Sequence, residues 1–276
     1  MTALRLARLS FVMLCLVAAA GAGAQPQQAQ QGFEPHVGQE GKDVVWVPTS
    51  QALVDKMLDL AKVTSRDSVI DLGSGDGRTV ITAAKRGARA MGIEYNPDMV
   101  ELSKRNAEKA GVADKVKFVK ADLFETDLSQ ATVITMFLLN TINMKLRPKL
   151  LDLKPGTRIV SNTFTMGDWH ADETATAGES EYYNTALLWI VPAKVEGAWK
   201  LAQGELVLKQ TFQMIDGTLK SGANSTPITK GKLRGDQIQF SAGGADYSGR
   251  VAGGAMEGTV KTGGSTAAWS ATRTKP

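Results

Sequence analysis

The stretch that decides the fold of this 276-residue chain is Val69-Ile70-Asp71-Leu72-Gly73-Ser74-Gly75-Asp76-Gly77-Arg78. An apolar run that carries one carboxylate is followed by three glycines at alternate positions, and residues 79–85 then have a helical pattern. Glycines let a turn pass close to a ligand at a helix N-terminus. A dinucleotide-binding loop is spaced G-x-G-x-x-G, whereas this loop is spaced G-x-G-x-G. The stretch therefore predicts a strand, a ligand-binding turn and a helix.

Two further apolar segments also end near an acid. The second segment ends at Glu94, 19 residues beyond Gly75, and the third is followed by Asp122. In doubly wound sheets the carboxyl ends of parallel strands line the ligand crevice, and an acid about 20 residues after the glycine loop binds ribose hydroxyls. One such acid alone is often only a turn former. Three such acids at successive strand ends, which are Asp71, Glu94 and Asp122, predict a nucleoside-type ligand.

Strands and helices alternate from residue 51 to residue 160, which is typical of a βαβ sheet. Apolar spacing predicts a helix over 51–62, and Asn96 and Pro97 open another helix that Gly111 closes. Residues 131–138 form a mostly apolar run, as in a parallel strand buried on both faces. The stretch 171–181, which is rich in acidic residues, is expected to form a surface loop. Residues 182–191 are expected to form the last strands of the sheet.

Residues 46–193 resemble class I (seven-strand) S-adenosylmethionine-dependent methyltransferases, in a bacterial group related to the mitochondrial lysine methyltransferases that modify the ATP synthase c-subunit. The motifs that carry the resemblance are 47–49, 71–78, 92–97, 120–124, 155–161 and 167–169. They cover a little over half of the chain. The resemblance implies S-adenosylmethionine as the cofactor and an α/β fold with a doubly wound, mostly parallel Rossmann-like sheet.

By this resemblance, Asp71 and the glycine loop hold the methionine part of the cofactor, Glu94 the ribose and Asp122 the adenine amine. The expected cofactor-binding residues are Asp71, Gly73, Gly75, Gly77, Glu94, Asp122 and Leu123. Because a sulfonium is already activated, the protein has mainly to align the methyl acceptor and exclude water.

The acceptor pocket is expected at the end of the fourth strand, around residues 139–143. Asn140 is the first candidate catalytic residue, since its amide would orient an acceptor; the alternative is that it caps the following helix. Trp169 is the second candidate, as an aromatic wall that holds a cationic amine; the alternative is ordinary packing. The acceptor is left open between a protein lysine and a small molecule.

Residues 1–24 read as a signal peptide. Arg5 and Arg8 precede a short apolar core, and 22–24 form a small-residue cleavage site. The expected location is the periplasm or cell envelope, with no stable membrane span after cleavage; the alternative is an uncleaved anchor. The single cysteine, Cys15, lies in this leader, so the mature chain has no disulfide or thiolate. The two histidines, His36 and His170, have no ligand cluster around them, so no metal site is expected.

The chain has 32 basic and 28 acidic residues and a formal net charge of +4. This balance is too weak and too mixed to predict nucleic-acid binding. The oligomeric state is not indicated. Residues 25–45 are rich in Gln and Gly and read as a flexible linker.

The pattern changes near residue 195. Half of the 28 glycines lie from Gly197 onward, and apolar residues then recur with a period of two between turn signals. This predicts a small antiparallel all-β domain over 195–276, either a barrel or a curved sheet. Such a barrel either binds an apolar ligand or is packed and purely structural.

Two functions are consistent with this sequence. The first is a methyltransferase, favoured by the complete set of acids. The second is an exported, non-catalytic envelope binding protein with a relict nucleoside site, whose function lies in the β domain.

Overall fold

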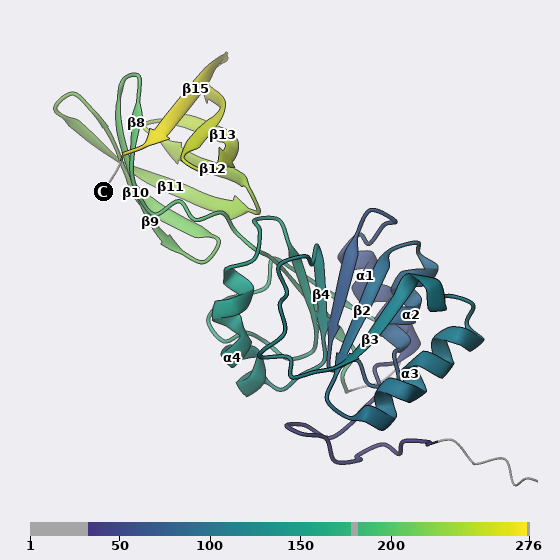
Figure 1. Ribbon diagram of the computed structural model, residues 1–276. Coiled ribbons are helices and arrows are strands. Elements are labelled where there is room, and N and C mark those ends of the chain that lie inside the picture. The colour runs from purple at the N-terminus through teal and green to yellow at the C-terminus, as the bar shows by residue number, and fades with distance from the viewer. Residues whose placement is uncertain (1–32, 178–181, 275–276) are drawn as a thin grey trace, which may run out of the picture. The chain divides into compact units, whose positions relative to one another are not determined.

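The computed structural model describes residues 33–177 and 182–274. The predicted signal peptide, 1–24, and the first part of the predicted linker, 25–32, lie outside the described residues. Within the described part, a seven-stranded sheet with its helices is followed along the chain by a closed eight-stranded barrel (Figure 1). None of the helices in this part of the chain is both long and apolar enough to cross a membrane.

The seven strands of the sheet are ordered β3-β2-β1-β4-β5-β7-β6. Their bounds are β1 Ser68–Leu72, β2 Arg89–Glu94, β3 Val116–Lys120, β4 Val133–Met136, β5 Arg158–Asn162, β6 Glu173–Thr176 and β7 Thr185–Ile190. The pairs from β3 to β5 are parallel, whereas β7 pairs antiparallel with β5 and with β6. The predicted mostly parallel, Rossmann-like sheet is confirmed. The register sets Asp71 beside Gly92 on one side and Thr135 on the other.

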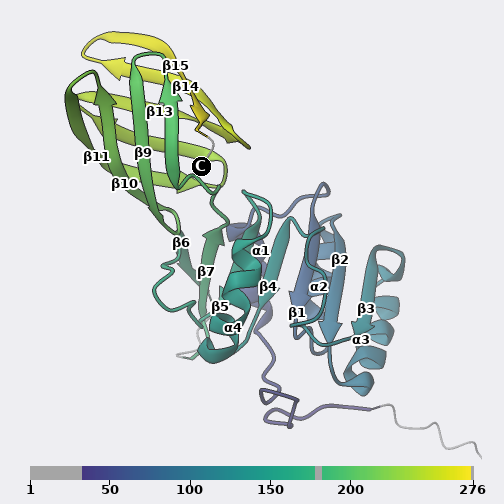
Figure 2. The ribbon, with the colours of Figure 1, turned by 60° about the vertical axis from the view of Figure 1, so that its left-hand side comes forward.

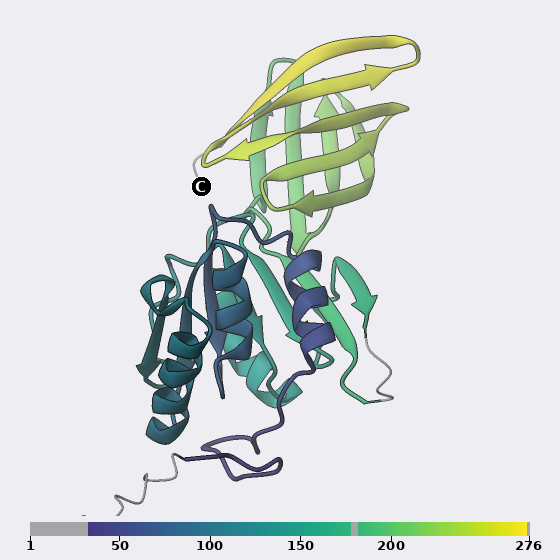
Figure 3. The ribbon, with the colours of Figure 1, turned by 90° about the vertical axis from the view of Figure 1, so that its right-hand side faces the viewer.

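Four α-helices cover the sheet: α1 Gln51–Leu60, α2 Arg78–Lys85, α3 Pro97–Lys109 and α4 Asn140–Leu151, with a short 3₁₀ turn at Ala113–Lys115. The first three lie on one face of the sheet and α4 lies on the other (Figures 2 and 3). The Asn96 side chain accepts a hydrogen bond from the Asp98 N–H at 2.9 Å, so the predicted N-cap of α3 is confirmed. Helix α1 stops at Leu60, because Lys62 takes a left-handed backbone with a φ of 51°.

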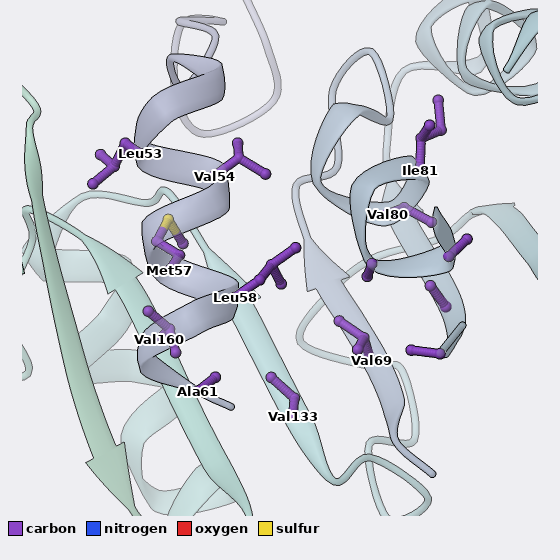
Figure 4. Close-up of a cluster of buried hydrophobic side chains, with 14 of the residues drawn as sticks. Leu53, Val54, Met57, Leu58, Ala61, Val69, Val80, Ile81, Val133 and Val160 are labelled. Atoms are coloured by element: carbon purple, nitrogen blue, oxygen red, sulfur yellow. The ribbon is translucent and has the colours of Figure 1, made fainter. Parts of the chain in front are cut away.

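Successive side chains of the central strands point to opposite faces of the sheet and pack into two separate hydrophobic cores. Val69, Val133 and Val160 pack against α1 and α2 (Figure 4), whereas their neighbours Ile70 and Ile134 pack with α4 on the other face. Both faces of these strands are therefore apolar, which explains why their sequences show no alternation.

The acidic stretch expected to be a loop contains a strand. Residues 173–176 form β6 and pair with β7 at the edge of the sheet. Its side chains alternate between half-buried and exposed, because only one face of this edge strand is covered. The loop prediction was therefore wrong for these four residues, while residues 178–181 lie outside the described part of the chain. The predicted final strand is confirmed as β7.

The C-terminal strands close into a barrel in the order β10-β11-β12-β13-β14-β15-β8-β9. Their bounds are β8 Gly197–Leu201, β9 Gly204–Thr211, β10 Met214–Ser221, β11 Asn224–Arg234, β12 Gln237–Ala242, β13 Ala245–Ala252, β14 Ala255–Thr262 and β15 Ser265–Arg273. All neighbours pair antiparallel, which confirms the predicted antiparallel β structure. Its alternate side chains form one buried cluster in which Phe240 and Tyr247 stack at 4.6 Å between ring centroids. This packed cluster supports the structural interpretation of the barrel.

Candidate functional site

A cavity of about 210 Å³ lies at the carboxyl ends of β1 to β5. The glycine loop, the acids at the ends of β1 and β2 and the turn after β3 line one part of it. Residues 39–49, which precede α1, also line the cavity; we call them the strap. The predicted ligand crevice and this cavity therefore coincide in position, and part of the predicted linker belongs to its wall.

The three glycines of the loop all have left-handed backbones, with φ of 74° at Gly73, 53° at Gly75 and 82° at Gly77. A Cβ atom at Gly75 would lie 2.7 Å from Trp46 Nε1, and one at Gly77 would lie 2.9 Å from the Phe118 ring. The conformation and the close packing both require glycine. Gly77 is also the N-cap of α2, so the loop brings the N-terminus of that helix to the cavity.

Asp71 lies in the floor of the cavity and is 6% exposed. The Thr135 hydroxyl donates a hydrogen bond of 2.6 Å to its carboxylate. Burial, with smaller contributions from Glu94 and Asp76, raises the pKa of the Asp71 carboxyl to about 7, although the Thr135 hydrogen bond opposes the shift. The ionised form of Asp71 is therefore poorly compensated inside the cavity, and a cation bound beside it would stabilise that form.

Glu94 lies at the end of β2 and organises the glycine loop. One of its carboxylate oxygens accepts a hydrogen bond of 2.9 Å from the Gly75 N–H, and the other accepts from the N–H groups of Tyr95 and Asn96. The side chain thus joins the turn after β1 to the turn after β2. The structure places Asp71, Glu94, Gly73 and Gly75 in the wall of one cavity, while Gly77 follows them as the N-cap of α2.

Asp122 and Leu123 lie in the turn after β3 and line the same cavity. Lys42 of the strap forms an ion pair of 2.5 Å with Asp122 and lies 4.7 Å from the centre of the Tyr95 ring. The hydrogen bond from Lys42 lowers the pKa of the Asp122 carboxyl. The strap was not predicted as part of the site, because its sequence has neither helical nor strand periodicity and residues 39–45 were assigned to the linker.

Asn140 neither lines the cavity nor caps the helix. It is the first residue of α4, whose N-cap is Leu139, and its side-chain oxygen accepts a hydrogen bond of 2.8 Å from the Thr165 N–H. The sequence predicted that Asn140 either orients the acceptor or caps the helix, and the observed hydrogen bond to Thr165 fits neither role. What Asn140 does in the structure is hold the loop that follows β5.

Trp169 is fully buried and is absent from the cavity wall, so the structure contradicts its predicted role as an aromatic wall. Its ring stacks on Phe212 at a centroid distance of 5.9 Å, and its carbonyl accepts a hydrogen bond from the Trp189 indole N–H. The physical reason is the turn between β9 and β10, which carries Phe212 and covers this ring. Trp169 is a packing residue.

Three aromatic side chains that the sequence did not single out do line the cavity. Phe137 follows β4, Phe164 follows β5, and Tyr183 precedes β7. They are scattered over nearly fifty positions with no common spacing, so only the order of the strands in the sheet could have grouped them.

The charges of the cavity favour a cationic ligand. Acidic side chains outnumber the cationic ones in its wall, and the two cations, Lys42 and Arg78, already pair with Asp122 and Asp76. Within the described part of the chain, Asp71 and Glu94 have no ion-pair partner. A cavity with two unpaired carboxylates, one of them buried, suits a ligand that carries positive charge.

The family model and the similar proteins all indicate a methyltransferase family. Residues 71–173 match the family model described as the ANTKMT methyltransferase domain. A protein-lysine N-methyltransferase of Saccharolobus islandicus is 43% identical over 151 residues, which are 54% of this chain and 94% of that protein. A mouse lysine N-methyltransferase named for the c-subunit of ATP synthase is 34% identical over 134 residues, which are 48% of this chain and 54% of the mouse protein.

A solved structure also matches about half of the chain. It is described as an RNA methyltransferase from Salinibacter ruber in complex with S-adenosyl-L-homocysteine, and it is 49% identical with a TM-score of 0.51. The match covers 54% of this chain and 96% of that one. The fold of about half of this chain is thus shared with methyltransferases, and these matches leave the remaining part uncovered.

Proposed function

Because the chain belongs to the class I S-adenosylmethionine-dependent methyltransferases, in the family of the ANTKMT domain, we propose that it methylates a lysine side-chain amine of a protein. The observation that carries this proposal is the 43% identity to a protein-lysine N-methyltransferase, over 94% of that relative. The chain is an S-adenosylmethionine-dependent enzyme; the lysine acceptor is the proposed part.

The cavity suits the cofactor in charge. S-adenosylmethionine carries a sulfonium and an ammonium, and it supplies an activated methyl group when bound. We propose that Asp71 and the loop of Gly73, Gly75 and Gly77 hold its methionine part. Glu94 would bind the ribose, and Asp122 with Leu123 the adenine end.

A nucleic-acid acceptor is the rival suggested by the description of the Salinibacter relative. Two features of this chain speak against it. The net charge of +4 is small and mixed, and the cavity wall is rich in carboxylates that would repel phosphates. No feature of the described residues favours the non-catalytic binding protein considered above.

We also propose that the enzyme acts in the periplasm or envelope, on the strength of the basic, apolar and small-residue order of residues 1–24. Protein recovered from the envelope should begin at Gln25 by intact mass. Recovery of the full chain from the cytoplasm would contradict export.

The acceptor can be identified by methyl labelling. The purified chain is incubated with S-adenosylmethionine labelled in the methyl group and with protein and RNA fractions of the source cells. We expect the label in protein, resistant to nuclease and released as methyllysine after acid hydrolysis. Asp71→Ala is the matched inactive control. Label in RNA, or in no macromolecule although the cofactor binds, would overturn the lysine proposal.

A further inference from the structure

We propose that Phe137, Phe164 and Tyr183 form the acceptor subsite and hold the amine end of the lysine side chain against their rings. This inference rests on the proposed function and deepens it, because it assigns the place and the chemistry of acceptor recognition. It also replaces the aromatic wall that the sequence had assigned to Trp169.

The three rings form one mutually contacting cluster. The centroid of Phe137 lies 5.8 Å from that of Phe164 and 5.2 Å from that of Tyr183, and the remaining pair is 5.9 Å apart. All three residues line the cavity. None of the rings is fully buried, and Tyr183 is 44% exposed, so the cluster reaches from the cavity to the surface.

The order of the strands separates this cluster from the acids. Asp122, Glu94 and Asp71 follow or end β3, β2 and β1, whereas the aromatic residues adjoin β4, β5 and β7, which are the next strands across the sheet. The cavity therefore has an acidic side, assigned to the cofactor, and an aromatic side next to it. A methyl acceptor has to lie beside the cofactor and reach solvent, and the aromatic side meets both conditions.

The backbone that carries Phe164 is held in a costly conformation. Thr163 has a left-handed φ of 59°, which is unfavourable for a β-branched residue. The buried Asn143 amide donates hydrogen bonds to the carbonyls of Phe164 and Thr165, and Asn140 accepts one from the Thr165 N–H. Two asparagines of α4 thus fix the loop, and we assign them as positioning residues for Phe164.

Tyr183 has a left-handed backbone as well, with a φ of 53°. Two of the loops that present the cluster therefore have strained residues, and such strain persists where the surrounding structure over-determines it, which is common at ligand-binding sites. A cluster that served only packing would not need its partly exposed member in this conformation.

The rings match the charge change in methyl transfer. The lone pair of the neutral amine forms a bond to the methyl carbon while the carbon–sulfur bond breaks, and the sulfur keeps that electron pair. The nitrogen becomes positively charged, and its surplus proton leaves to water. An aromatic face attracts a cation far more than a neutral amine. The subsite therefore stabilises the transition state over the neutral acceptor.

The test uses the full chain with S-adenosylhomocysteine bound. The probe is n-butylammonium, which reproduces the end of a lysine side chain, and n-butanol is the neutral probe of the same size. Each is titrated while the ring protons of the protein are followed by nuclear magnetic resonance. We expect n-butylammonium to bind at least fivefold more tightly and to shift the Phe and Tyr ring signals.

The variants are Phe137→Leu, Phe164→Leu and Tyr183→Leu. Each should lower the preference for n-butylammonium, and kcat/KM for methyl transfer to lysine-containing protein should fall at least fivefold, while the cofactor affinity stays within twofold. Tyr182→Leu is the matched control, since this neighbouring tyrosine is 74% exposed and is not part of the cavity wall. Thermal denaturation and cofactor titration of each variant identify any that fails to fold.

Equal binding of the two probes, or lysine methylation that is unchanged in all three folded variants, would overturn the inference while leaving the proposed function intact. A preference for n-butylammonium that the variants abolish, in a protein that labels RNA rather than lysine, would support a cation-binding subsite but refute its role in lysine methylation. The two failures are therefore distinguishable.

Discussion

At the scale of single residues, the protonation state of the Asp71 carboxyl and the binding of the cofactor depend on each other. This carboxyl is buried near the acids Glu94 and Asp76, and its pKa is raised to about 7. Only the ionised carboxylate attracts a cation. A cationic cofactor must therefore lower this pKa when it binds, and by linkage the cofactor affinity must depend on pH.

We predict that the cofactor affinity is constant above about pH 8 and falls as the pH drops below about 7, by up to about tenfold per pH unit. The sign follows from the raised pKa, because at low pH binding has to expel a proton from Asp71. Calorimetric titration from about pH 5.5 to about pH 8.5 measures the effect on both sides of this pKa. Asp71→Asn should bind weakly without this dependence, and an identical pH profile in that variant would refute the assignment.

Glu94 is a second single residue on which cofactor binding should depend, because its carboxylate accepts hydrogen bonds from three backbone N–H groups. We predict that Glu94→Ala weakens cofactor binding by about 1–3 kcal/mol, the range for the loss of hydrogen bonds to a charged group. Part of this loss should be indirect, because the Gly75 N–H loses its partner and the loop loosens. Glu94→Gln retains one acceptor oxygen and should lose less. Equal cofactor affinity in Glu94→Ala and the unchanged protein would contradict the prediction.

At the scale of elements, the strap and the turn after β3 meet at one ion pair. Lys42 and Asp122 are 35% and 28% exposed, so the pair is well solvated. Lys42 pairs with the carboxylate that we assign to the adenine end of the cofactor. Binding of the cofactor at Asp122 therefore has to compete with the strap.

We predict that Lys42→Met binds the cofactor about two- to fivefold more tightly than the unchanged protein, a size in keeping with an exposed pair. Raising the salt concentration should lower the cofactor affinity of the unchanged protein less than that of the variant, because salt screens the competing Lys42–Asp122 pair as well as the attraction between the acids and the cationic cofactor. Titrations at about 0.05 M and about 0.5 M NaCl, on either side of physiological ionic strength, test both statements. Weaker binding by Lys42→Met would mean that Lys42 contacts the cofactor instead.

The elements also show how far the sequence predicts this structure. The glycine loop and the Asn96–Pro97 helix start were predictable, because turns and caps depend on local residue chemistry. Strand β6 was not, since a short edge strand depends on its partner β7. The aromatic cluster was missed and Trp169 misassigned for a related reason: which ring faces the cavity depends on strand order and on Phe212, far along the chain.

At the scale of the whole molecule, a barrel residue neutralises a buried acid beside the sheet. The Asp172 side chain is fully buried, and one of its oxygens accepts a hydrogen bond of 2.9 Å from the Ile190 N–H. Its other oxygen has no hydrogen-bond partner and lies 3.5 Å from Lys232 Nζ of β11. Chain segments that the sequence assigns to separate domains, 46–193 and 195–276, therefore share this charge pair in addition to the exposed Arg234–Glu173 pair. The boundary itself stays a prediction.

We predict that Lys232→Ala lowers the free energy of unfolding by about 1–2 kcal/mol. Leaving a buried charge unpaired costs about 3–5 kcal/mol, but Lys232 is 38% exposed and water already screens part of the interaction. Arg234→Ala, which removes the exposed pair with Glu173 on the neighbouring elements, is the matched control and should cost less than about 1 kcal/mol.

Denaturant unfolding of the full chain measures both values. Adding Asp172→Asn to Lys232→Ala should recover part of the lost stability, because the charge that Lys232 balanced is then gone while the side chain can still accept from the Ile190 N–H. Cofactor affinity should stay unchanged in all of these variants, since neither residue of the pair lines the cavity. If Lys232→Ala and Arg234→Ala lower the free energy of unfolding equally, the burial of Asp172 does not determine the energy of the Lys232–Asp172 pair.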